Sequence, residues 1–300
     1  MNNARAVRTG LLSALICYCL WGLQPLYWHL DGTFDSVFLM ASRAVAAALF
    51  CLILLAIQGK LGQLKAVFAD PKLLAREIPA SLFLFGDWFV FIWAVQHRQV
   101  LECSVGYYIQ PLVVFAFGAL LFHEKCRAYH FAALGFVLAG IVVSALALGS
   151  LPWVTVSLAL MFAVYAAIKK SLTIDSVVST SCEILIMAPF LLAYLLIFRR
   201  GPGGLAEIDL PRALFLLGGG VITGLPILLY SVSVKRLRLI TVSIGQYVSP
   251  TLGVLCSLIL REEITREKLI SLALIWAGIL IYLFFTIREL KTPKETTGEA

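Results

Sequence analysis

The chain is divided into ten apolar runs that are bounded by charged residues, glycine or proline. The runs lie at 10–30, 34–57, 78–97, 101–122, 128–148, 151–170, 176–198, 211–234, 238–260 and 267–287. Each run holds roughly the 20 apolar residues that a helix needs to cross the hydrocarbon core of a bilayer. We therefore predict an all-α integral membrane protein with ten transmembrane helices. The first is expected to be an uncleaved helix, because no small-residue cleavage pattern interrupts it.

The composition supports this interpretation and disfavours most soluble functions. Of 300 residues, 61% are apolar and 14% are charged, whereas an average soluble protein has about 25% charged residues. Ten spans leave about 100 residues for loops and tails, so nucleic-acid binding, cytosolic catalysis and a secreted disulfide scaffold are all disfavoured. The 4 histidines and 7 cysteines have no metal-ligand spacing, and no phosphate-binding loop occurs. We expect no metal and no cofactor.

The basic residues are distributed unevenly between the predicted loops. With the N-terminus in the cytoplasm, 16 of the 24 Lys and Arg residues face the cytoplasm, 7 face the other side, and Arg43 lies within a span. Such a bias is typical of cytoplasmic loops, so we predict that both termini are cytoplasmic. The net charge of +7 then reflects membrane topology rather than a nucleic-acid partner.

The two halves of the chain resemble one another when the sequence is shifted by 139 residues. GYYIQP at 106–111 aligns with GQYVSP at 245–250, and Glu124 aligns with Glu263. A shift of 140 brings Arg43 onto Glu183. Because five helices are an odd number, two such copies cross the membrane in opposite directions. We predict inverted repeats at 1–150 and 151–288, followed by a disordered cytoplasmic tail at 289–300. Inverted repeats are typical of secondary transporters, which bind substrate near the midplane.

Four segments carry a resemblance to a known family. They are CLWGLQPLYWHL in the first span, GDWFVFIWAVQHRQVLECSVGYYIQPLVVFAFGALLFHEK across the third and fourth, GSLPW before the sixth, and KRLRLITVSIGQYVSPTLGVL at the ninth. Together they resemble the RarD-type transporters in the EamA branch of the drug/metabolite transporter superfamily. This resemblance implies a bacterial inner-membrane carrier with ten helices in two five-helix repeats. It also implies export of metabolites or amino acids or, for the RarD type, an association with chloramphenicol.

Three ionisable residues lie within predicted spans, where a charge costs about 2.5–3.5 kcal/mol at the bilayer centre. Asp87 lies near the middle of the third span, Arg43 about eight residues into the second, and Glu183 at a similar depth in the seventh. Burial favours a neutral Asp87 unless a cation pairs with it, and Arg43 is the obvious cation. We expect a buried charge network that serves proton coupling or substrate binding. A static ion pair that locks the helices together is the alternative.

Aromatic and amide side chains near these charges are candidates for the lining of an amphipathic cavity. Such a lining presents ring faces and a few hydrogen-bonding groups to a ligand. The candidates are Trp21, Trp88, Tyr107, Tyr108, Gln110, Tyr165, Gln246 and Tyr247.

Two prolines at equivalent positions of the repeats predict symmetric hinges. Pro111 and Pro250 each lie about ten residues into a span, where proline removes a backbone donor and disturbs the helix. Gly106 and Gly245 precede them by five residues. Elsewhere, the small-residue spacings of Gly135 with Ala139, Gly140 with Ser144, and Gly220 with Gly224 predict close helix packing.

Together these features favour a secondary active transporter that exports a small organic metabolite, an amino acid or an amphiphilic drug such as chloramphenicol. Alternating access driven by the proton gradient is the expected mechanism. The expected partners are the small-molecule substrate, H⁺ and the lipid bilayer. An uncoupled facilitator and a membrane-embedded lipid-modifying enzyme are alternatives, although the chain lacks the Asp-rich clusters of such enzymes and no enzymatic activity is expected. The cargo and the oligomeric state, a homodimer included, stay open.

Overall fold

The computed structural model describes residues 3–28, 30, 34–96, 100–124, 126–148, 153–200, 204–259 and 266–291. These residues form helices and no strand, which confirms the predicted all-helical class for the described part of the chain. The first half contains α1 (Asn3–Trp28), α2 (Ser36–Ile57), α3 (Leu61–Ala69), α4 (Pro71–Gln96), α5 (Val100–Leu121) and α6 (Ala128–Leu148). The second half contains α7 (Trp153–Ser171), α8 (Ser176–Phe198), the 3₁₀ turn η1 (Leu205–Glu207), α9 (Leu210–Arg236), α10 (Leu239–Gly245), α11 (Val248–Ile259) and α12 (Arg266–Lys291).

Four of the described helices are long and apolar enough to cross a membrane. They cover Arg5–Trp28, Val37–Ile57, Ser176–Phe198 and Leu210–Arg236. Shorter apolar stretches lie at Gly106–Leu121, Ala128–Val143 and Leu269–Tyr282. Every predicted apolar run is occupied by helix, and the ninth run contains two helices, α10 and α11.

The largest differences from the predicted spans are at α3 and α4. The polar segment between the second and third runs was expected to be a loop, but it folds into α3, whose Leu64 and Val67 are buried against Leu55 and Val178. The helix α4 begins at Pro71, seven residues before the predicted start at 78. Consequently Glu77 lies inside the bundle rather than at the end of a span, and its side chain is fully buried. At the other end of the chain, α12 continues to Lys291, past the predicted start of the tail, and residues 292–300 lie outside the described part.

The helices α2 and α8, which occupy equivalent places in the two halves, begin with the same aspartate cap. The carboxylate of Asp35 accepts hydrogen bonds from the backbone N–H groups of Val37 and Phe38 at the start of α2. The carboxylate of Asp175 accepts from Val177 and Val178 at the start of α8. Each aspartate thereby satisfies N–H groups that have no partner within the first turn of a helix.

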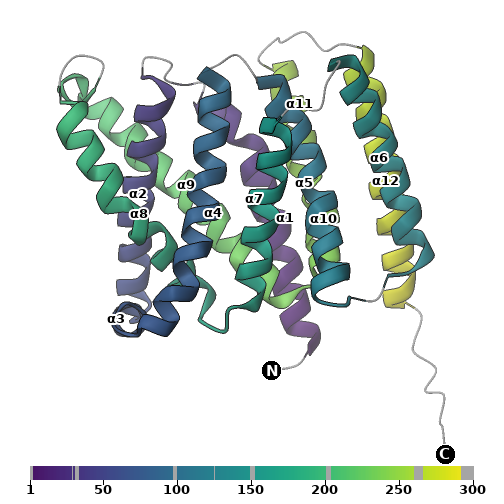
Figure 1. Ribbon diagram of the computed structural model, residues 1–300, viewed down its shortest axis with the longest axis horizontal. Helices are drawn as coiled ribbons and strands as arrows, with labels where there is room; N and C mark the ends of the chain where they lie inside the picture. Colours follow the sequence, from purple (N-terminus) through teal and green to yellow (C-terminus); the bar gives the residue numbers. More distant parts are fainter. Residues whose placement is uncertain are drawn as a thin grey trace, which may run out of the picture.

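The helices stand side by side, with α6 and α12 paired at one end of the molecule (Figure 1). The start of α1, the end of α12 and the short helix α3 lie at the same edge. In the interior, α2 packs on α8 and α9, α1 on α9 and α11, α4 on α7 and α8, and α5 on α7 and α10. Every one of these interior contacts joins the first half of the chain to the second.

The contact between α2 and α9 depends on glycine. A Cβ atom added to Gly220 would lie 2.4 Å from the carbonyl carbon of Ala46, and one added to Gly224 would lie 2.8 Å from Cδ1 of Phe50. Both distances are too short for a real side chain, so α9 approaches α2 this closely only because these residues have no Cβ. The close packing predicted for Gly220 and Gly224 is confirmed. A Cβ atom added to Gly135 would have no neighbour within 4 Å, so the close packing predicted for Gly135 is wrong.

Candidate functional site

Arg43 and Asp87 lie in the interior on neighbouring helices, together with two tryptophans. The guanidinium carbon of Arg43, on α2, lies 5.7 Å from the ring centroid of Trp28 and 5.1 Å from that of Trp88. Asp87, on α4, is only 3% exposed and interacts electrostatically with Arg43. Tyr107, on α5, also interacts electrostatically with Arg43. We refer to Trp28, Arg43, Asp87 and Trp88 as the Arg43–Asp87 cluster.

The Arg43–Asp87 cluster has polar atoms without hydrogen-bond partners. Within the described part of the chain, the buried Nε of Arg43, Oδ1 of Asp87 and Nε1 of Trp28 have no hydrogen-bond partner. Buried polar groups are normally satisfied, because an unmade hydrogen bond costs about 1–3 kcal/mol. Contact with two indole faces compensates the arginine charge by roughly 0.5–2 kcal/mol each. The cluster therefore has the capacity to bind a polar ligand, with a cation, an acid and two ring faces available.

A second buried cluster surrounds Glu183. The Nζ atom of Lys169, on α7, lies 2.5 Å from Oε1 of Glu183, on α8, and donates to Oγ of Ser179 at 2.9 Å. The hydroxyl of Tyr165 donates to the other oxygen of Glu183 at 3.1 Å, and Ser81, on α4, donates to its backbone carbonyl at 2.7 Å. All five side chains are buried. With Glu77, they form what we call the Lys169–Glu183 cluster.

Glu77 is the one acid of this cluster without a normal hydrogen bond. Its carboxyl group faces the hydroxyl of Ser179 and the carboxylate of Glu183. Nevertheless, neither of its buried oxygens has a hydrogen-bond partner of normal geometry within the described residues. Within the described residues, the carboxyl groups of Glu77 and Glu183 thus lie close to the ammonium group of Lys169.

Aromatic rings connect the interior faces of α1, α7 and α9. The ring of Trp21 lies 5.4 Å from that of Tyr230 and 5.9 Å from that of Phe162, and the ring of Tyr165 lies 6.3 Å from that of Tyr230. These are the separations of packed aromatic pairs. Trp21 and Tyr165 were predicted to line a cavity, and here both belong to this group of packed rings, with Tyr165 also bound to Glu183.

The glutamines and the remaining tyrosines lie where the two halves meet at α5, α10 and α11. Gln110 and Gln246 are buried, and Oε1 of each has no partner within the described residues. The hydroxyl of Tyr247 donates to the backbone carbonyl of Tyr108 at 3.1 Å, and the two residues are 139 positions apart. The residues that the sequence repeat aligned with each other are therefore in direct contact.

The four predicted hinge residues are not equivalent in the structure. Pro111 and Gly106 lie within α5, which is continuous from Val100 to Leu121. In the second half the helix breaks, because α10 ends at Gly245 and α11 begins at Val248. Pro250 is the third residue of α11, where the backbone N–H has no partner in the helix and proline is tolerated. The break therefore precedes the proline, and it has no counterpart at Pro111.

The structure separates the predicted charge network into two parts. Arg43 and Asp87 are neighbours, as expected, but the partner of Glu183 is Lys169. Lys169 was assigned to a cytoplasmic loop end, because it lies beside Lys170 at the end of an apolar run. The pattern did contain a signal, since Tyr165 and Lys169, like Ser179 and Glu183, are four residues apart and so share one face of a helix.

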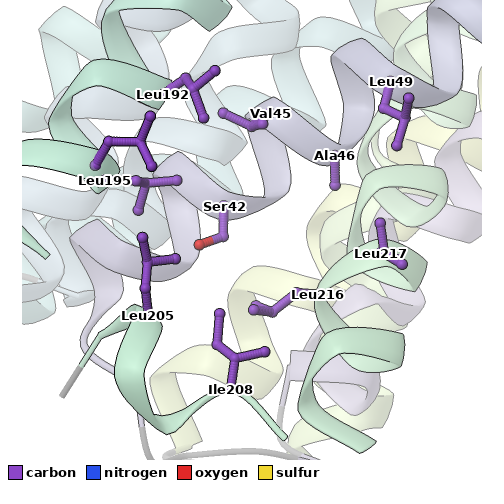
Figure 2. A pocket seen from close by; sticks show the side chains of 11 residues that line it. Ser42, Val45, Ala46, Leu49, Leu192, Leu195, Leu205, Ile208, Leu216 and Leu217 are labelled. Atoms are coloured by element: carbon purple, nitrogen blue, oxygen red, sulfur yellow. The ribbon is translucent and has the colours of Figure 1, made fainter. Parts of the chain in front are cut away.

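One cavity of about 240 Å³ lies outside both clusters, between α2, α8, η1 and α9 (Figure 2). Its lining is apolar except for the hydroxyl of Ser42, with leucines and Ile208 around it. Such a lining has little capacity to orient a polar solute. Within the described residues, no group of three or more His, Cys, Asp or Glu is placed to hold a metal ion.

Long apolar helices that bury ionisable side chains among themselves define a multi-pass membrane protein. The chain belongs to the EamA-like transporter family, which matches residues 8–146 and again residues 151–284. It is therefore a transporter, and the family resemblance inferred from the four sequence segments is confirmed.

Relatives cover nearly the whole chain. The uncharacterized transporter YojE of Bacillus subtilis is 33% identical over 293 residues, which are 96% of this chain and 97% of YojE. Protein RarD of Salmonella typhimurium is 29% identical over 287 residues, 95% of this chain and 98% of RarD. The chloramphenicol-sensitive protein RarD of Pseudomonas aeruginosa is 28% identical over 278 residues, 91% of this chain and 92% of that protein. A protein of known crystal structure superposes with a TM-score of 0.72 over 96% of this chain and 99% of that chain. At 19% identity, this likeness shows the fold alone.

Proposed function

We propose that the protein is a secondary active transporter that exports a small organic solute by alternating access and couples this export to the proton gradient. Family membership supports the transport class. The observation that carries the coupled mechanism is the burial of ionisable groups within the bundle, Asp87 beside Arg43 and Glu183 beside Lys169. Ionisable residues inside a membrane are costly and typically serve ion or substrate pathways.

The proposed architecture is ten spans in two inverted repeats, residues 1–150 and 151–288. The family matches the chain once in each of these parts. Reciprocal ion pairs also support it. Asp35, the cap of α2, pairs with Arg199 after the end of α8, and Asp175, the cap of α8, pairs with Lys60 after the end of α2, at 3.1 Å. A two-fold axis between the repeats would exchange these two pairs.

The packing of the helices supports the same symmetry. The repeats make α1, α2 and α4 the counterparts of α7, α8 and α9, and α5 the counterpart of α10 and α11. With each helix replaced by its counterpart, the contact of α1 with α9 becomes that of α7 with α4, and the contact of α2 with α9 becomes that of α8 with α4. Likewise the contact of α1 with α11 becomes that of α7 with α5. All of these contacts occur. Inverted repeats of this kind permit alternating access, because the halves can exchange conformations around a shared site.

We place the protein in the bacterial inner membrane with both termini in the cytoplasm. The excess of basic residues in the loops on that side supports this orientation. The location of the start of α1 and the end of α12 at one edge is consistent with it (Figure 1).

The Arg43–Asp87 cluster is the proposed substrate site. Its cation, acid and indole faces suit a zwitterionic amino acid or an amphiphilic aromatic solute. Chloramphenicol is a reasonable first probe, because one relative is named a chloramphenicol-sensitive protein. Of the other candidate residues, Tyr107, Tyr108, Gln110, Gln246 and Tyr247 lie on α5, α10 and α11 or between them, and we propose that they contribute when the halves rearrange.

Reconstituted vesicles test this proposal. Purified protein is placed in proteoliposomes with an imposed pH gradient, and the flux of labelled chloramphenicol and of a panel of labelled amino acids is measured. We expect gradient-driven flux of at least one probe in the wild type and its loss in Asp87→Asn. Asp70→Asn is the matched control, because Asp70 is a cap before α4 whose role asparagine can take over.

Two outcomes would contradict the proposal. Gradient-driven flux that survives Asp87→Asn excludes Asp87 from both substrate binding and coupling. Exchange of a probe with no dependence on the pH gradient in the wild type would instead indicate an uncoupled facilitator.

A further inference from the structure

We propose that the Lys169–Glu183 cluster binds one exchangeable proton, shared between the carboxyl groups of Glu77 and Glu183, and that this is the coupling-proton site of the transporter. This inference deepens the proposed function and rests on it. It separates two roles, because the proton is bound at one end of α4 and the substrate at the Arg43–Asp87 cluster farther along the same helix.

The contacts of the cluster among the described residues satisfy the carboxylate of Glu183 but not the carboxyl group of Glu77. Each oxygen of Glu183 has a partner, since Lys169 contacts one of them and Tyr165 the other. Glu77 faces this carboxylate and has no hydrogen-bond partner of normal geometry within the described residues. The side chains of Glu77, Lys169 and Glu183 are all 0% exposed, so water does not compensate the charge.

Charge balance then requires a proton. Two buried carboxylates beside one ammonium group would carry a net negative charge in a medium of low dielectric. Two carboxyl groups that share one site do not readily both ionise. A single proton makes the three groups neutral. It also gives Glu77 a donor that can be directed to the Glu183 carboxylate it faces.

Among the described residues, the neighbouring elements do not supply another counter-charge of the same closeness. On α7 and α8, the titratable groups that face Glu77 are Lys169, Tyr165, Glu183 and Cys182. Lys235, on α9, also interacts with Glu77 and Glu183, but its ammonium group is held at the carbonyl of Ile174, before the start of α8, and Lys169 is the cation that acts most strongly on Glu77.

The other helices that pack on α4 contribute less. On α2, the thiol of Cys51 lies near Lys169 and Glu183, while Arg43 belongs to the other cluster. On α3, Lys65 is exposed. On α5, Tyr107 lies near Arg43 and the backbone carbonyl of Tyr108 is bonded to Tyr247.

The location of the cluster suits proton exchange with one side of the membrane. Glu77 is six residues from the start of α4, or roughly 9 Å at 1.5 Å per residue. Lys169 and Ser179 lie close to the end of α7 and the start of α8. The ion pair of Lys60 with Asp175 lies at the same edge. A proton therefore needs only a short path to the cluster from this edge, whereas Asp87 lies ten residues, roughly 15 Å, deeper along α4.

A metal cation fits this cluster less well than a proton. A cation such as Na⁺ requires several oxygen ligands and would sit next to the ammonium group of Lys169. A proton needs one oxygen, and the carboxyl pair provides it.

Infrared difference spectroscopy tests the proton site without a transported substrate. Spectra of the purified, detergent-solubilised protein are recorded at mildly acidic and mildly alkaline pH for the wild type, Glu77→Gln, Asp87→Asn and Glu207→Gln. We expect the wild type to show a protonated-carboxyl band that disappears with rising pH. Glu77→Gln should lack this band, whereas Asp87→Asn and the exposed control Glu207→Gln should retain it.

A second variant keeps the proposal testable if Glu77→Gln does not fold. Tyr165→Phe removes the hydrogen bond to the second oxygen of Glu183, so the carboxylate holds the shared proton more tightly. We expect the titration midpoint of the band to move to higher pH while the band itself is retained. A band that Tyr165→Phe leaves unmoved contradicts the shared site.

The outcomes also separate this inference from the proposed function. A band that survives Glu77→Gln but is lost in Asp87→Asn overturns the inference and leaves coupling at Asp87. If the band disappears only when Na⁺ is present, a metal cation rather than the pH removes the proton, and the inference is overturned. If Glu77→Gln removes the band and, in the vesicle assay, abolishes gradient-driven flux but retains exchange without a gradient, the inference is supported. If the wild type has the band but its flux ignores the gradient, the proposed coupling fails and the proton site stands.

Discussion

Arg43 is held by aromatic faces rather than by a close ion pair. Its guanidinium group lies between Trp28 and Trp88, and Asp87 interacts with it without a hydrogen bond to Oδ1. A planar, delocalised cation suits this environment, because it stacks on rings and keeps its charge when water is removed. The same geometry leaves its edge available to a ligand.

We expect Arg43→Ala to reduce transport of a probe that the wild type carries by at least about tenfold, which corresponds to about 1.4 kcal/mol. Arg43→Lys should be intermediate, because lysine keeps the charge but not the planar stack. Flux in proteoliposomes is the measurement, with Arg76→Ala, an exposed position on α4, as the control. Normal flux in Arg43→Ala would mean that the cluster plays no part in transport.

The Lys169–Glu183 pair makes a prediction about stability. Removing one partner of a buried ion pair strands the other charge and costs about 3–5 kcal/mol. We expect Lys169→Met to lower the thermal unfolding midpoint in detergent strongly, and Lys169→Met combined with Glu183→Leu to recover a large part of that loss. A double variant that is no more stable than the single one would contradict the pairing.

At the residue scale, the sequence predicted which charges are buried better than it predicted their partners. Asp87, Arg43 and Glu183 stood out because each interrupts an apolar run. Lys169 and Glu77 did not, because each lies near the end of a run, where a charged residue normally reaches water. Their burial follows from the early start of α4 and from α3, which are tertiary features that hydropathy does not report.

At the scale of elements, Asp175 both caps α8 and forms an ion pair with Lys60. Burial alone would raise the pKa of its carboxyl group, but Lys60 and the backbone N–H groups of Val178 and Val177 outweigh burial and hold the pKa below its usual value. A lowered pKa in the folded state contributes stability that is present above the unfolded pKa of about 3.9 and is lost as the pH falls through the folded pKa.

We therefore expect Asp175→Asn to lower the free energy of unfolding at neutral pH by about 0.5 kcal/mol, because the pair is partly exposed, and the thermal midpoint to fall slightly with it. The difference from the wild type should vanish in strong acid. Asp175→Ala also removes the cap and should cost about 1 kcal/mol more. The measurement is the unfolding midpoint as a function of pH. A difference between Asp175→Asn and the wild type that does not change with pH would exclude the ion pair as its cause.

The close approach of α2 and α9 gives a steric prediction. Gly220→Ala places a Cβ atom 2.4 Å from the carbonyl carbon of Ala46, and overpacking of this kind costs about 1–3 kcal/mol. Gly253→Ala is the matched control, because a Cβ atom there has no neighbour within 4 Å. We expect a lower unfolding midpoint in the first variant and little change or a small gain in the second. Equal midpoints would show that the helices separate easily.

Hydropathy located the long elements well and the irregular ones poorly. Symmetric hinges were predicted at Gly106 with Pro111 and at Gly245 with Pro250, but among the described residues the helix breaks directly after Gly245 and stays continuous through Gly106 and Pro111. Proline at the third residue of α11 starts a helix, whereas Pro111 lies inside one. The same local sequence pattern therefore adopts two conformations, and the choice between them is made by packing.

At the scale of the whole molecule, the inverted architecture makes a topological prediction. The loops near Arg127 and Arg266, which the repeat aligns, should lie on opposite sides of the membrane. Labelling of Arg127→Cys and Arg266→Cys in a cysteine-free background with a membrane-impermeant reagent measures this, and Arg8→Cys should label from the same side as Arg127→Cys. Labelling of Arg127→Cys and Arg266→Cys from the same side of the membrane would contradict the inverted arrangement of the repeats.

The hydrogen bond between Tyr247 and Tyr108 has a direction, and it runs between two residues that the repeat makes equivalent. If the halves exchange conformations, this bond must reverse, with the hydroxyl of Tyr108 donating to the carbonyl of Tyr247. One side chain acts as donor when the molecule faces one compartment, and its twin does so when the molecule faces the other. Replacing either tyrosine with phenylalanine would then favour one orientation of the carrier, and the two replacements would favour opposite ones.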